Sequence, residues 1–419
     1  MSARISTIKK VAILTGASLA WNPRAFKEAK TLADAGFDVV VYGSNQNESK
    51  ARIDSELATK SGFRFVPVNV RRETQVLRLF PDLSRLHNRI GRILFKVFAI
   101  ENPWQIGPLT TELRHQALIS KSDYHIVHLE QALWVGANLL KHDLAVGIDM
   151  EDWYSEDLMP EARAGRPLRS LRDLEATLLR SARHSTCPSL AMRNALAGEF
   201  NCPPPQVIYN AFPWSDRRTL DGQVKDRMNR LVPSIHWYSQ TLGHGRGLEE
   251  LFTALPFIDH DIEIHLRGNP IPGFEAWLDQ QVAPGRRSRV FLHDLVSNDE
   301  LLSRIAEHDI GFAGEQKYCR SRDLTVTNKI LHYLLGGLAV VASDTAGQHE
   351  IAQQAGAGVR LYHTGDPLDL AAQFNSLLEN RQRLNEAKAA ALSAAKQTFC
   401  WERQQGKLLD SVERALHDR

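Results

Sequence analysis

A glycine-rich stretch in the second half of the chain could bind a phosphorylated ligand. Gly243, Gly245 and Gly247 surround Arg246, and the stretch follows an apolar run and precedes a helical pattern. Glycines let a backbone approach a ligand closely, and the amides of a helix N-terminus favour an anion. Arg246 adds a full positive charge, as a diphosphate requires. A glycine-rich turn with a surface arginine is the alternative interpretation.

A second polar cluster, over residues 323–344, could complete such a site. It consists of a polar loop, an amphipathic helix, a Gly-Gly stop, a buried strand and an acidic turn. Lys329 lies in the first turns of the helix, where its ammonium could reach a phosphate oxygen; a solvated helix lysine is the alternative. The expected ligand-binding residues of this half are Gly243, Gly245, Arg246, Gly247, Glu315, Thr327, Asn328, Lys329, His332 and Glu350.

The first glycine loop argues against two common nucleotide ligands. Thr15–Arg24 follows the first apolar run and contains one glycine, Gly16. A dinucleotide-binding loop needs three glycines, and an ATPase loop needs a Gly-Lys-Ser/Thr ending. We therefore expect neither a nicotinamide cofactor nor ATP hydrolysis.

The elements that position these residues are short β-branched runs alternating with helical patterns. Such runs are typical of parallel strands covered on both faces by crossover helices. A polar pause at 213–233 separates two series, which predicts two Rossmann-like, doubly wound α/β domains (1–215 and 216–395) facing across a cleft at their strand ends. Residues 396–419 are expected to form a helix that packs back on the domain junction. The predicted strands are Val11–Leu14, Asp38–Tyr42, His125–Leu129, Val146–Asp149, Ser185–Cys187 and Val207–Tyr209, then Ser234–Tyr238, Ile262–Leu266, Val290–Leu292, Ile310–Ala313, Ala339–Ala342 and Gly358–Leu361.

Composition is consistent with this division. A chain of 419 residues is too long for one ordinary core. The 51 basic and 49 acidic residues give a net charge of +2, which gives no reason to expect a nucleic-acid partner. The four cysteines form no C-x-x-C pair and are expected to be reduced thiols rather than metal ligands. No apolar stretch has the length of a signal-peptide core or a membrane span, so a cytoplasmic protein is expected.

The order and spacing of these segments resemble the group-one (family four) glycosyltransferases, which have the GT-B fold. Gly243–Glu249 resembles the family's donor-diphosphate loop, and Asn328–Tyr333 with Gly337–Ala342 is similar to its nucleotide segment. In the first half the resemblance is carried by Asn22-Pro-Arg24 with Lys27-Glu28, Gly36–Val40, Tyr124–Glu130, Ile148–Asp152, Pro188-Ser189 and Tyr209–Pro213.

The resemblance implies transfer of a sugar from a nucleotide diphosphate-sugar, with retention, without a metal or other cofactor, and in surface polysaccharide or glycoconjugate synthesis. Arg246 and Lys329 would stabilise the leaving diphosphate. Glu130 is the candidate to orient the acceptor hydroxyl or accept its proton, although a carboxylate that merely pairs at the rim is an equal alternative. Glu315 would contact donor-sugar hydroxyls. The expected acceptor-side residues are Gly16, Asn22, Arg24, Glu151 and Asp152, and the acceptor is expected to be a glycan or a lipid-linked molecule.

Three departures from the family pattern keep other functions open. Leu324 and His332 stand where the family has two glutamates, so ribose recognition passes to His332 or a neighbour. Thr241 replaces a second basic residue of the diphosphate loop, and Glu130 replaces the second histidine of an H-x-H segment. The alternatives are a GT-B nucleotide-sugar epimerase or hydrolase and a degenerate, non-catalytic partner protein.

One helical pattern at 78–98 allows two interpretations. Apolar residues recur at helical spacing with basic residues between them. One interpretation is a helix whose apolar face lies in the core. The other is a basic amphipathic helix on an anionic membrane, which would place the protein peripherally at the inner membrane face. The apolar set is Leu79, Leu83, Leu86, Ile90, Ile93 and Val97, and the basic set is Arg85, Arg89, Arg92 and Lys96.

Overall fold

The computed structural model describes residues 9–44, 48–68, 79–227 and 231–417. The chain forms two compact units by its contacts. The N-terminal unit comprises Met1–Pro188, Met192–Ile208 and Gln405–Arg419, and the C-terminal unit comprises Ser189–Ala191 and Tyr209–Gln404. Compared with the domain limits expected from the sequence, residues 209–215 group with the second unit and residues 405–419 with the first.

The N-terminal unit is built on a seven-stranded parallel sheet with strand order β3-β2-β1-β4-β5-β6-β7. All six strands predicted here are confirmed, with small shifts at their ends. The short β3 was not predicted; among the described residues it pairs with β2 alone, and its side chains are half-buried or exposed, so it lacks a continuous apolar run. The strands are β1 Lys10–Thr15, β2 Asp38–Gly43, β3 Arg64–Pro67, β4 Tyr124–His128, β5 Val146–Asp149, β6 His184–Cys187 and β7 Gln206–Val207.

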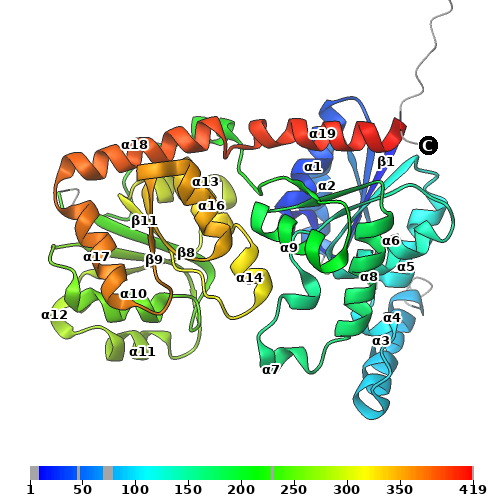
Figure 1. Cartoon of the computed structure of the whole chain (residues 1–419), viewed down its shortest axis with the longest axis horizontal. Helices are drawn as coiled ribbons and strands as arrows, with labels where there is room; N and C mark the ends of the chain where they lie inside the picture. The colour runs from blue at the N-terminus through cyan, green and yellow to red at the C-terminus, as the bar shows by residue number, and fades with distance from the viewer. Residues whose placement is uncertain (1–8, 45–47, 69–78, 228–230, 418–419) are drawn as a thin grey trace, which may run out of the picture. The chain divides into compact units, whose positions relative to one another are not determined.

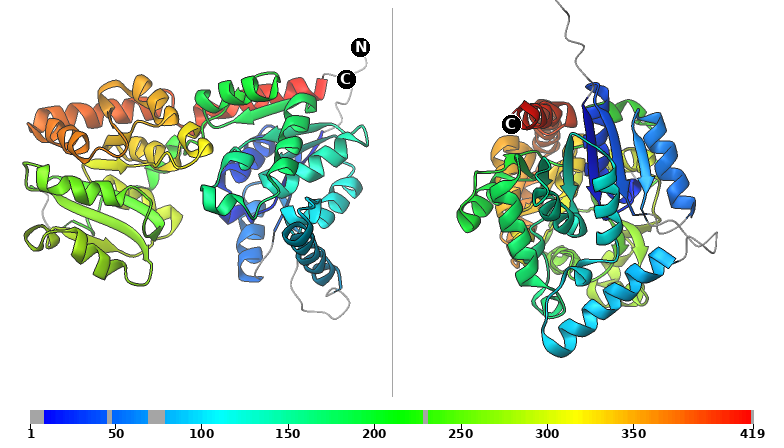
Figure 2. Two further views of the ribbon diagram at one scale, coloured as in Figure 1. Left: turned by 60° about the horizontal axis from the view of Figure 1, so that its bottom comes forward. Right: turned by 90° about the vertical axis from the view of Figure 1, so that its right-hand side faces the viewer.

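Helices lie on both faces of this sheet (Figures 1 and 2). The first helix begins at Pro23, because proline suits the first turn of a helix and the Asn22 side chain accepts the Ala25 amide. The helices are α1 Pro23–Asp34, α2 Glu48–Lys60, α3 Leu79–Phe98, α4 Pro103–Ile106, α5 Thr110–Ile119, α6 Leu129–Leu140, α7 Pro160–Arg163, α8 Leu168–Ser181 and α9 Leu190–Phe200.

The C-terminal unit has a six-stranded parallel sheet with strand order β10-β9-β8-β11-β12-β13, which confirms the second predicted strand series. Its apolar core joins strand residues such as Ile264 and Phe312 to helix residues such as Phe252 and Phe374. The strands are β8 Ser234–Leu242, β9 Glu263–Pro270, β10 Val290–His293, β11 Ile310–Ala313, β12 Ala339–Ser343 and β13 Val359–Tyr362. The helices are α10 Leu248–Ala254, α11 Phe274–Gln281, α12 Pro284–Arg287, α13 Asn298–Ala306, α14 Arg320–Leu324, α15 Asn328–Gly336, α16 Ala346–Ala355, α17 Pro367–Leu378 and α18 Arg381–Gln397. The last helix, α19 Trp401–His417, begins in this unit, and its residues from Gln405 onward group with the N-terminal unit.

The core interpretation of the 78–98 pattern is wrong. Ile93 and Val97 of α3 are 53% and 63% exposed, because the helix packs by another face. His87 stacks on Trp104 with ring centroids 4.7 Å apart, and Asn88 donates to the Trp104 carbonyl at 2.6 Å. Periodicity showed that α3 has an apolar face but not what covers it. Residue 78 and the side chains of Leu79 and Leu83 lie outside the described residues.

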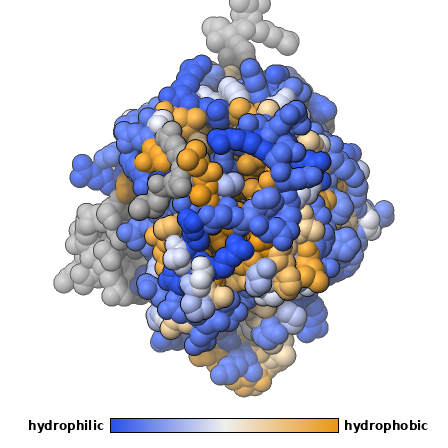
Figure 3. All heavy atoms as spheres, turned by 90° about the vertical axis from the view of Figure 1, so that its left-hand side faces the viewer, coloured by the Kyte–Doolittle hydropathy of each residue, from blue (hydrophilic) through white to orange (hydrophobic). Residues whose placement is uncertain are grey.

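Cys187, Cys202, Cys319 and Cys400 are free thiols. No helix in the described part of the chain is long and apolar enough to cross a membrane. On the face drawn in Figure 3, hydrophilic residues predominate and hydrophobic residues gather in separate patches.

Four histidines make the C-terminal unit sensitive to acid. Burial, and then repulsion from the neighbouring histidines, lowers the pKa of His265 to about 2. Burial lowers the pKa of His308 to about 4. At these four positions the unfolded chain, with ordinary histidine pKa values near 6.5, binds more protons than the folded chain between that pH and about 4. Stability is therefore lost as the pH falls through this window. The four side chains are His236, His265, His293 and His308.

We expect the urea midpoint of the C-terminal unit to fall between about pH 7 and about pH 5, with each of the four histidines contributing up to about 1.4 kcal/mol per pH unit. The variant His236→Phe should show a shallower dependence. Among the described residues, no hydrogen-bond partner is found for either ring nitrogen of the fully buried His236, so phenylalanine removes a titratable group without breaking a hydrogen bond. The same replacement at the exposed His244 is the control. A midpoint that does not change with pH would contradict this interpretation.

Candidate functional site

Each parallel sheet has a point at which the strand order reverses. In the N-terminal unit β1 lies between β2 and β4, and in the C-terminal unit β8 lies between β9 and β11. In open α/β sheets, ligands bind beyond the carboxyl ends of the strands at such points. The polar residues singled out in the sequence follow these strand ends.

The glycine-rich loop after β8 lies against the end of β11. Gly245 and Gly247 have φ angles of +71° and +82°, in the left-handed region that favours glycine. A Cβ at Gly247 would lie 2.2 Å from the Gly314 carbonyl oxygen, so this close approach requires glycine. Gly243 is buried in the same loop. The glycines therefore bring the loop beside the segment that carries Glu315.

Two side chains fix the charged part of this loop. The exposed Arg246 guanidinium donates to Ser239 Oγ at 2.9 Å. The Gly245 amide donates to Glu249 Oε1 at 2.7 Å. Arg246 is thus held at the carboxyl end of β8 with its guanidinium accessible to a ligand.

Lys329, on the first turn of α15, forms an ion pair with Glu315. Lys329 Nζ lies 2.7 Å from Glu315 Oε1, and the two side chains are only 17% and 13% exposed. The ammonium also lies 5.6 Å from the centre of the Trp237 ring, within the range of a cation–π contact. Burial opposes ionisation of Glu315, but the charge and hydrogen bond of Lys329, together with smaller contributions from Arg322 and Thr327, hold the pKa of that carboxyl below its usual range. Lys329 is therefore not the solvated surface lysine of the alternative interpretation.

His332 lies one turn further along α15 in an aromatic setting. Its ring stacks on Phe212 with centroids 3.9 Å apart and planes 11° apart, and its Nδ1 lies 3.0 Å from the Tyr238 hydroxyl. Leu324, the other position of the family's glutamate pair, ends α14, and its carbonyl accepts the Ser189 hydroxyl at 2.5 Å. Of these two positions, His332 therefore has a side chain with hydrogen-bonding groups at this site, and Leu324 does not.

The remaining predicted residues of the C-terminal unit contact protein groups. Thr327 is the N-cap residue of α15 and is buried. Asn328 is exposed, and its Oδ1 accepts from Asn210 Nδ2 at 2.9 Å. Glu350 Oε2 accepts the Leu190 amide at 2.8 Å, and burial raises the pKa of Glu350 to about 7. Its observed contacts are structural.

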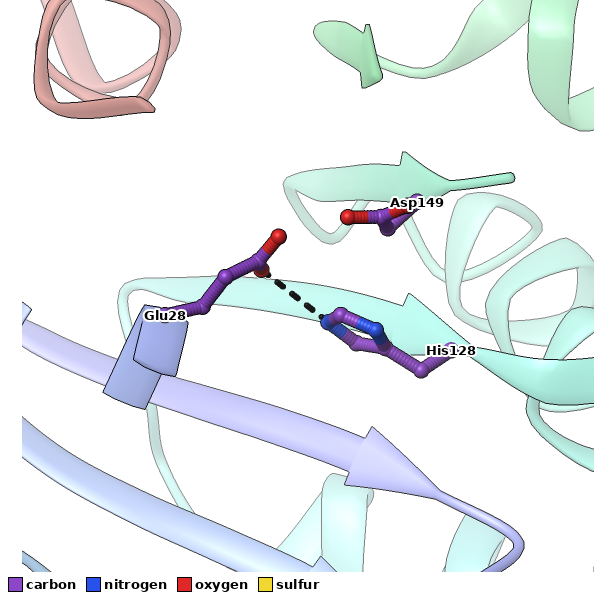
Figure 4. Close-up of side chains that lie close together, drawn as sticks. All are labelled: Glu28, His128 and Asp149. Atoms are coloured by element: carbon purple, nitrogen blue, oxygen red, sulfur yellow. Dashed lines mark hydrogen bonds and ion pairs between the residues drawn. The ribbon is translucent and has the colours of Figure 1, made fainter. Parts of the chain in front are cut away.

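In the N-terminal unit, side chains from α1, β4 and β5 meet in a buried polar network. Figure 4 shows Glu28 pointing toward His128, with Asp149 beside them. His128 Nε2 lies 3.1 Å from Glu28 Oε2, and Arg24 Nε lies 2.7 Å from Asp149 Oδ2. Arg24 also donates to the Ile208 carbonyl at 2.7 Å. The network joins segments that are far apart in the sequence.

Mutual electrostatics set the charges of this network. Burial and then the charge of Asp149 raise the pKa of Glu28 to about 8. Burial opposes ionisation of Asp149, but Arg24, with help from Glu28 and His128, holds the pKa of Asp149 well below its usual range. Burial also disfavours a charge on His128, yet Glu28 and Glu151 raise the pKa of His128 well above 6.5. At neutral pH the fixed buried charges of the network are therefore those of Arg24 and Asp149.

Glu151 extends this network toward solvent. Its Oε1 accepts from His128 Nδ1 at 2.9 Å and from Asn22 Nδ2 at 2.8 Å. The Glu151 side chain is 16% exposed, whereas the Asn22 side chain is buried and also reaches Thr15 Oγ1 at 3.3 Å. The structure thus brings together Asn22, Arg24 and Glu151 of the predicted acceptor-side set.

The other predicted residues of this unit lie around the network. Gly16 follows β1, and a Cβ there would lie 3.3 Å from Gln131 Cδ. Asp152 follows Glu151 and is half-buried. Glu130 lies in the first turn of α6 and forms an ion pair with Arg166. Burial raises the pKa of Glu130, and Arg166 opposes that shift. The observed contact of Glu130 is therefore an ion pair with Arg166, as in the alternative interpretation of a carboxylate that merely pairs at the rim.

The ligand atoms of Glu28, His128 and Asp149 lie within 4.8 Å of one another, a spacing that a metal ion could use. The Arg24 guanidinium is already hydrogen-bonded to the Asp149 carboxylate, and both ring nitrogens of His128 are hydrogen-bonded to carboxylates. A cation would have to compete with this buried positive charge. We interpret the cluster as an ion-pair network.

Sequence reasoning missed several members of both sites. Glu28, His128 and Asp149 lay inside segments already noticed for the family resemblance. The signal that could have identified His128 and Asp149 is their place at the ends of β4 and β5, whereas Glu28 lies within α1 and has no such signal. Phe212 and Tyr238 were missed because an aromatic residue near a strand end looks like a core residue in a sequence. Only their contacts with His332 reveal them.

Comparisons with known proteins address the fold. No family model matches this sequence, and no curated protein matches it. HepE from Anabaena, solved in complex with UDP and glucose, is 16% identical over 97% of this chain and 99% of its own, with a TM-score of 0.67. Sucrose-phosphate synthase from Thermosynechococcus elongatus is 13% identical over 98% of this chain and 100% of its own, with a TM-score of 0.69. A putative UDP-N-acetylglucosamine 2-epimerase from Listeria monocytogenes is 12% identical over 98% of this chain and 97% of its own, with a TM-score of 0.56.

At these identities the similarity shows the fold. The chain has two parallel sheets of seven and six strands, each flanked by helices, and its fold matches these structures over nearly their whole length. The chain consists of two Rossmann-like domains of the GT-B type.

Proposed function

We propose that the chain is a glycosyltransferase that moves a sugar from a nucleoside diphosphate-sugar to an acceptor hydroxyl. The observation that carries the proposal is the largely buried Lys329–Glu315 pair, which lies beside the glycine-rich loop at the strand-order reversal of the C-terminal sheet. A structurally similar protein, HepE, was solved with UDP and glucose. A lysine held in this setting suits a ligand whose negative charge grows as a bond breaks.

In the proposed reaction the C-terminal unit stabilises the leaving nucleoside diphosphate. Cleavage of the sugar–phosphate bond leaves negative charge on the diphosphate oxygens, and fixed cations lower the barrier most where water is excluded. Lys329 and Arg246 supply two such cations, so we propose that no metal ion is required. We further propose that His332, stacked on Phe212, takes over ribose recognition from the missing glutamate.

In the N-terminal unit, Glu151 and Glu130 remain the candidates for orienting the acceptor hydroxyl. Asn22 and His128 fix the position of Glu151, whereas Glu130 is paired with Arg166. We propose retention at the anomeric carbon and a role in surface polysaccharide or glycoconjugate synthesis, as the sequence resemblance implies. NMR analysis of the product's anomeric configuration tests the first of these, and inversion would exclude it.

A thermal-shift panel with UDP, GDP, dTDP, ADP and CMP tests donor binding. A ligand at about 100 times its Kd should stabilise the native chain by roughly 2.7 kcal/mol. We expect one nucleoside diphosphate to raise the melting temperature of the native chain and to lose that effect in Arg246→Ala. An exposed arginine outside the loop, Arg381, gives the matched control Arg381→Ala, which should keep the shift. If no nucleotide shifts the native protein, the proposed donor site is wrong.

The similar fold of a putative UDP-N-acetylglucosamine 2-epimerase supports a second candidate, a nucleotide-sugar epimerase or hydrolase. Such an enzyme would convert the donor without an acceptor. Incubation with donor alone separates the two: a changed or hydrolysed sugar nucleotide favours the alternative, and turnover only with acceptor favours transfer. Nucleotide binding without any turnover would favour the non-catalytic partner protein.

A further inference from the structure

We propose that α3 and the groove beside it form a docking surface for an anionic lipid bilayer. This inference goes beyond sugar transfer and does not depend on it. The surface is defined by an apolar row and a basic row on α3. The apolar row is Leu86, Ile90, Ile93 and Val97, and the basic row is Arg85, Arg89, Arg92 and Lys96.

The apolar row faces away from the unit's own core. Leu86, Ile90, Ile93 and Val97 are 49%, 37%, 53% and 63% exposed. These residues recur every three or four positions, so they form one continuous stripe along the helix. A stripe of large aliphatic side chains left in water is unfavourable unless another apolar phase covers it.

α4 fixes α3 in this orientation through the opposite face. A Cβ at Gly91 would lie 2.4 Å from Asn102 Oδ1 and 3.0 Å from the Gln105 amide nitrogen, so only glycine allows this approach. Asn102 Nδ2 donates to the Gly91 carbonyl at 3.1 Å. α3 lies at the margin of the N-terminal unit with α4 along it (Figures 1 and 2). The apolar stripe is therefore a fixed feature of the fold.

The basic row lines a groove next to the stripe. The groove has a volume of about 1310 Å³, and its lining includes all four basic residues of α3 together with Gln105 and Gly165. Between residues 83 and 100 the sequence has four basic residues and no acidic residue. The groove thus offers concentrated positive charge directly beside exposed apolar side chains.

Charge and apolarity together identify a lipid bilayer as the occupant. An anionic headgroup layer complements the basic row, and the acyl boundary below it accommodates the stripe, as for helices that lie in a membrane interface. A soluble anionic partner would match the charges but leave the stripe in water. Docking would hold the N-terminal unit at the membrane surface.

Sedimentation of the full chain with vesicles tests the proposal. The chain should bind vesicles of phosphatidylcholine mixed with phosphatidylglycerol, should bind phosphatidylcholine alone weakly, and should dissociate at high salt. The triple variant Arg89→Gln, Arg92→Gln, Lys96→Gln should reduce partitioning about 100-fold, since each basic side chain contributes roughly fivefold. The matched control removes the same charge at exposed sites elsewhere, with Lys60→Gln, Lys141→Gln and Arg381→Gln, and should bind nearly as the native chain does.

A second pair of variants tests the apolar stripe. Ile90→Ser with Ile93→Ser should weaken partitioning, whereas Leu118→Ser with Ile53→Ser should not. The two pairs have nearly the same exposure: Ile90 and Ile93 are 37% and 53% exposed, and Leu118 and Ile53 are 37% and 54% exposed. The replaced side chains are exposed, so unchanged circular dichroism and melting temperature should confirm folding. The proposal would be overturned if the chain did not bind vesicles, or if binding did not depend on vesicle charge and salt. It would also be overturned if the variants and their controls lost vesicle binding equally. The nucleotide thermal shift should persist in all these variants, which separates this test from that of donor binding.

Discussion

Replacement of Arg24 by methionine is expected to lower the free energy of unfolding of the N-terminal unit by about 3–5 kcal/mol. Arg24 and Asp149 are both almost fully buried and lie 2.7 Å apart. Methionine fills much of the space but leaves the Asp149 carboxylate without its cation in a site that water does not reach. Urea unfolding, followed by circular dichroism at neutral pH, measures the loss.

Two comparisons decide whether the buried charge is the cause. Arg52→Met removes the exposed Arg52–Glu56 pair of α2 and should cost about 0.5 kcal/mol or less. Asp149→Asn should cost less than Arg24→Met, because Glu28 lies 4.0 Å from Arg24 Nε and can ionise once the charge of Asp149 is gone. An Arg24→Met variant as stable as Arg52→Met would show that the network contributes little to stability.

The second large effect concerns the proposed reaction. Lys329→Gln is expected to lower kcat for sugar transfer by about 10²- to 10³-fold, the usual loss when one fixed group that stabilises developing negative charge is removed. Glutamine keeps much of the length of lysine and can still donate to Glu315, so the fold should survive. Steady-state kinetics with the donor identified by the thermal-shift panel measures kcat and KM separately.

Lys388 provides the matched control. Lys388 Nζ lies 2.8 Å from Asp309 Oδ1 in the same unit, and that pair is also partly buried. Lys388→Gln should change stability to a similar degree as Lys329→Gln but leave kcat unchanged. Equal losses of activity in the two variants would mean that Lys329 acts through stability alone, and unchanged activity in Lys329→Gln would remove it from the proposed mechanism.

The sequence by itself predicted the architecture, because the architecture depends on local signals. Buried parallel strands need short apolar runs, as at Val146–Asp149 and Ile310–Ala313, and both strands occur where these runs predict them. Asn22 and Pro23 mark the start of α1 by their own chemistry. The glycine-rich loop was also recognisable, since Gly245 and Gly247 are needed for the backbone angles that the loop adopts.

Only the tertiary structure decided which polar residues act together and which apolar residues are covered. Arg24, His128 and Asp149 belong to three elements, and nothing local to any of them indicates that burial pairs their charges. His332 acquires its aromatic partner from Phe212, which lies far from it in the sequence. The stripe of α3 shows the same limit: periodicity in a sequence identifies an apolar face, but contacts with distant segments determine whether that face lies in the core or in solvent.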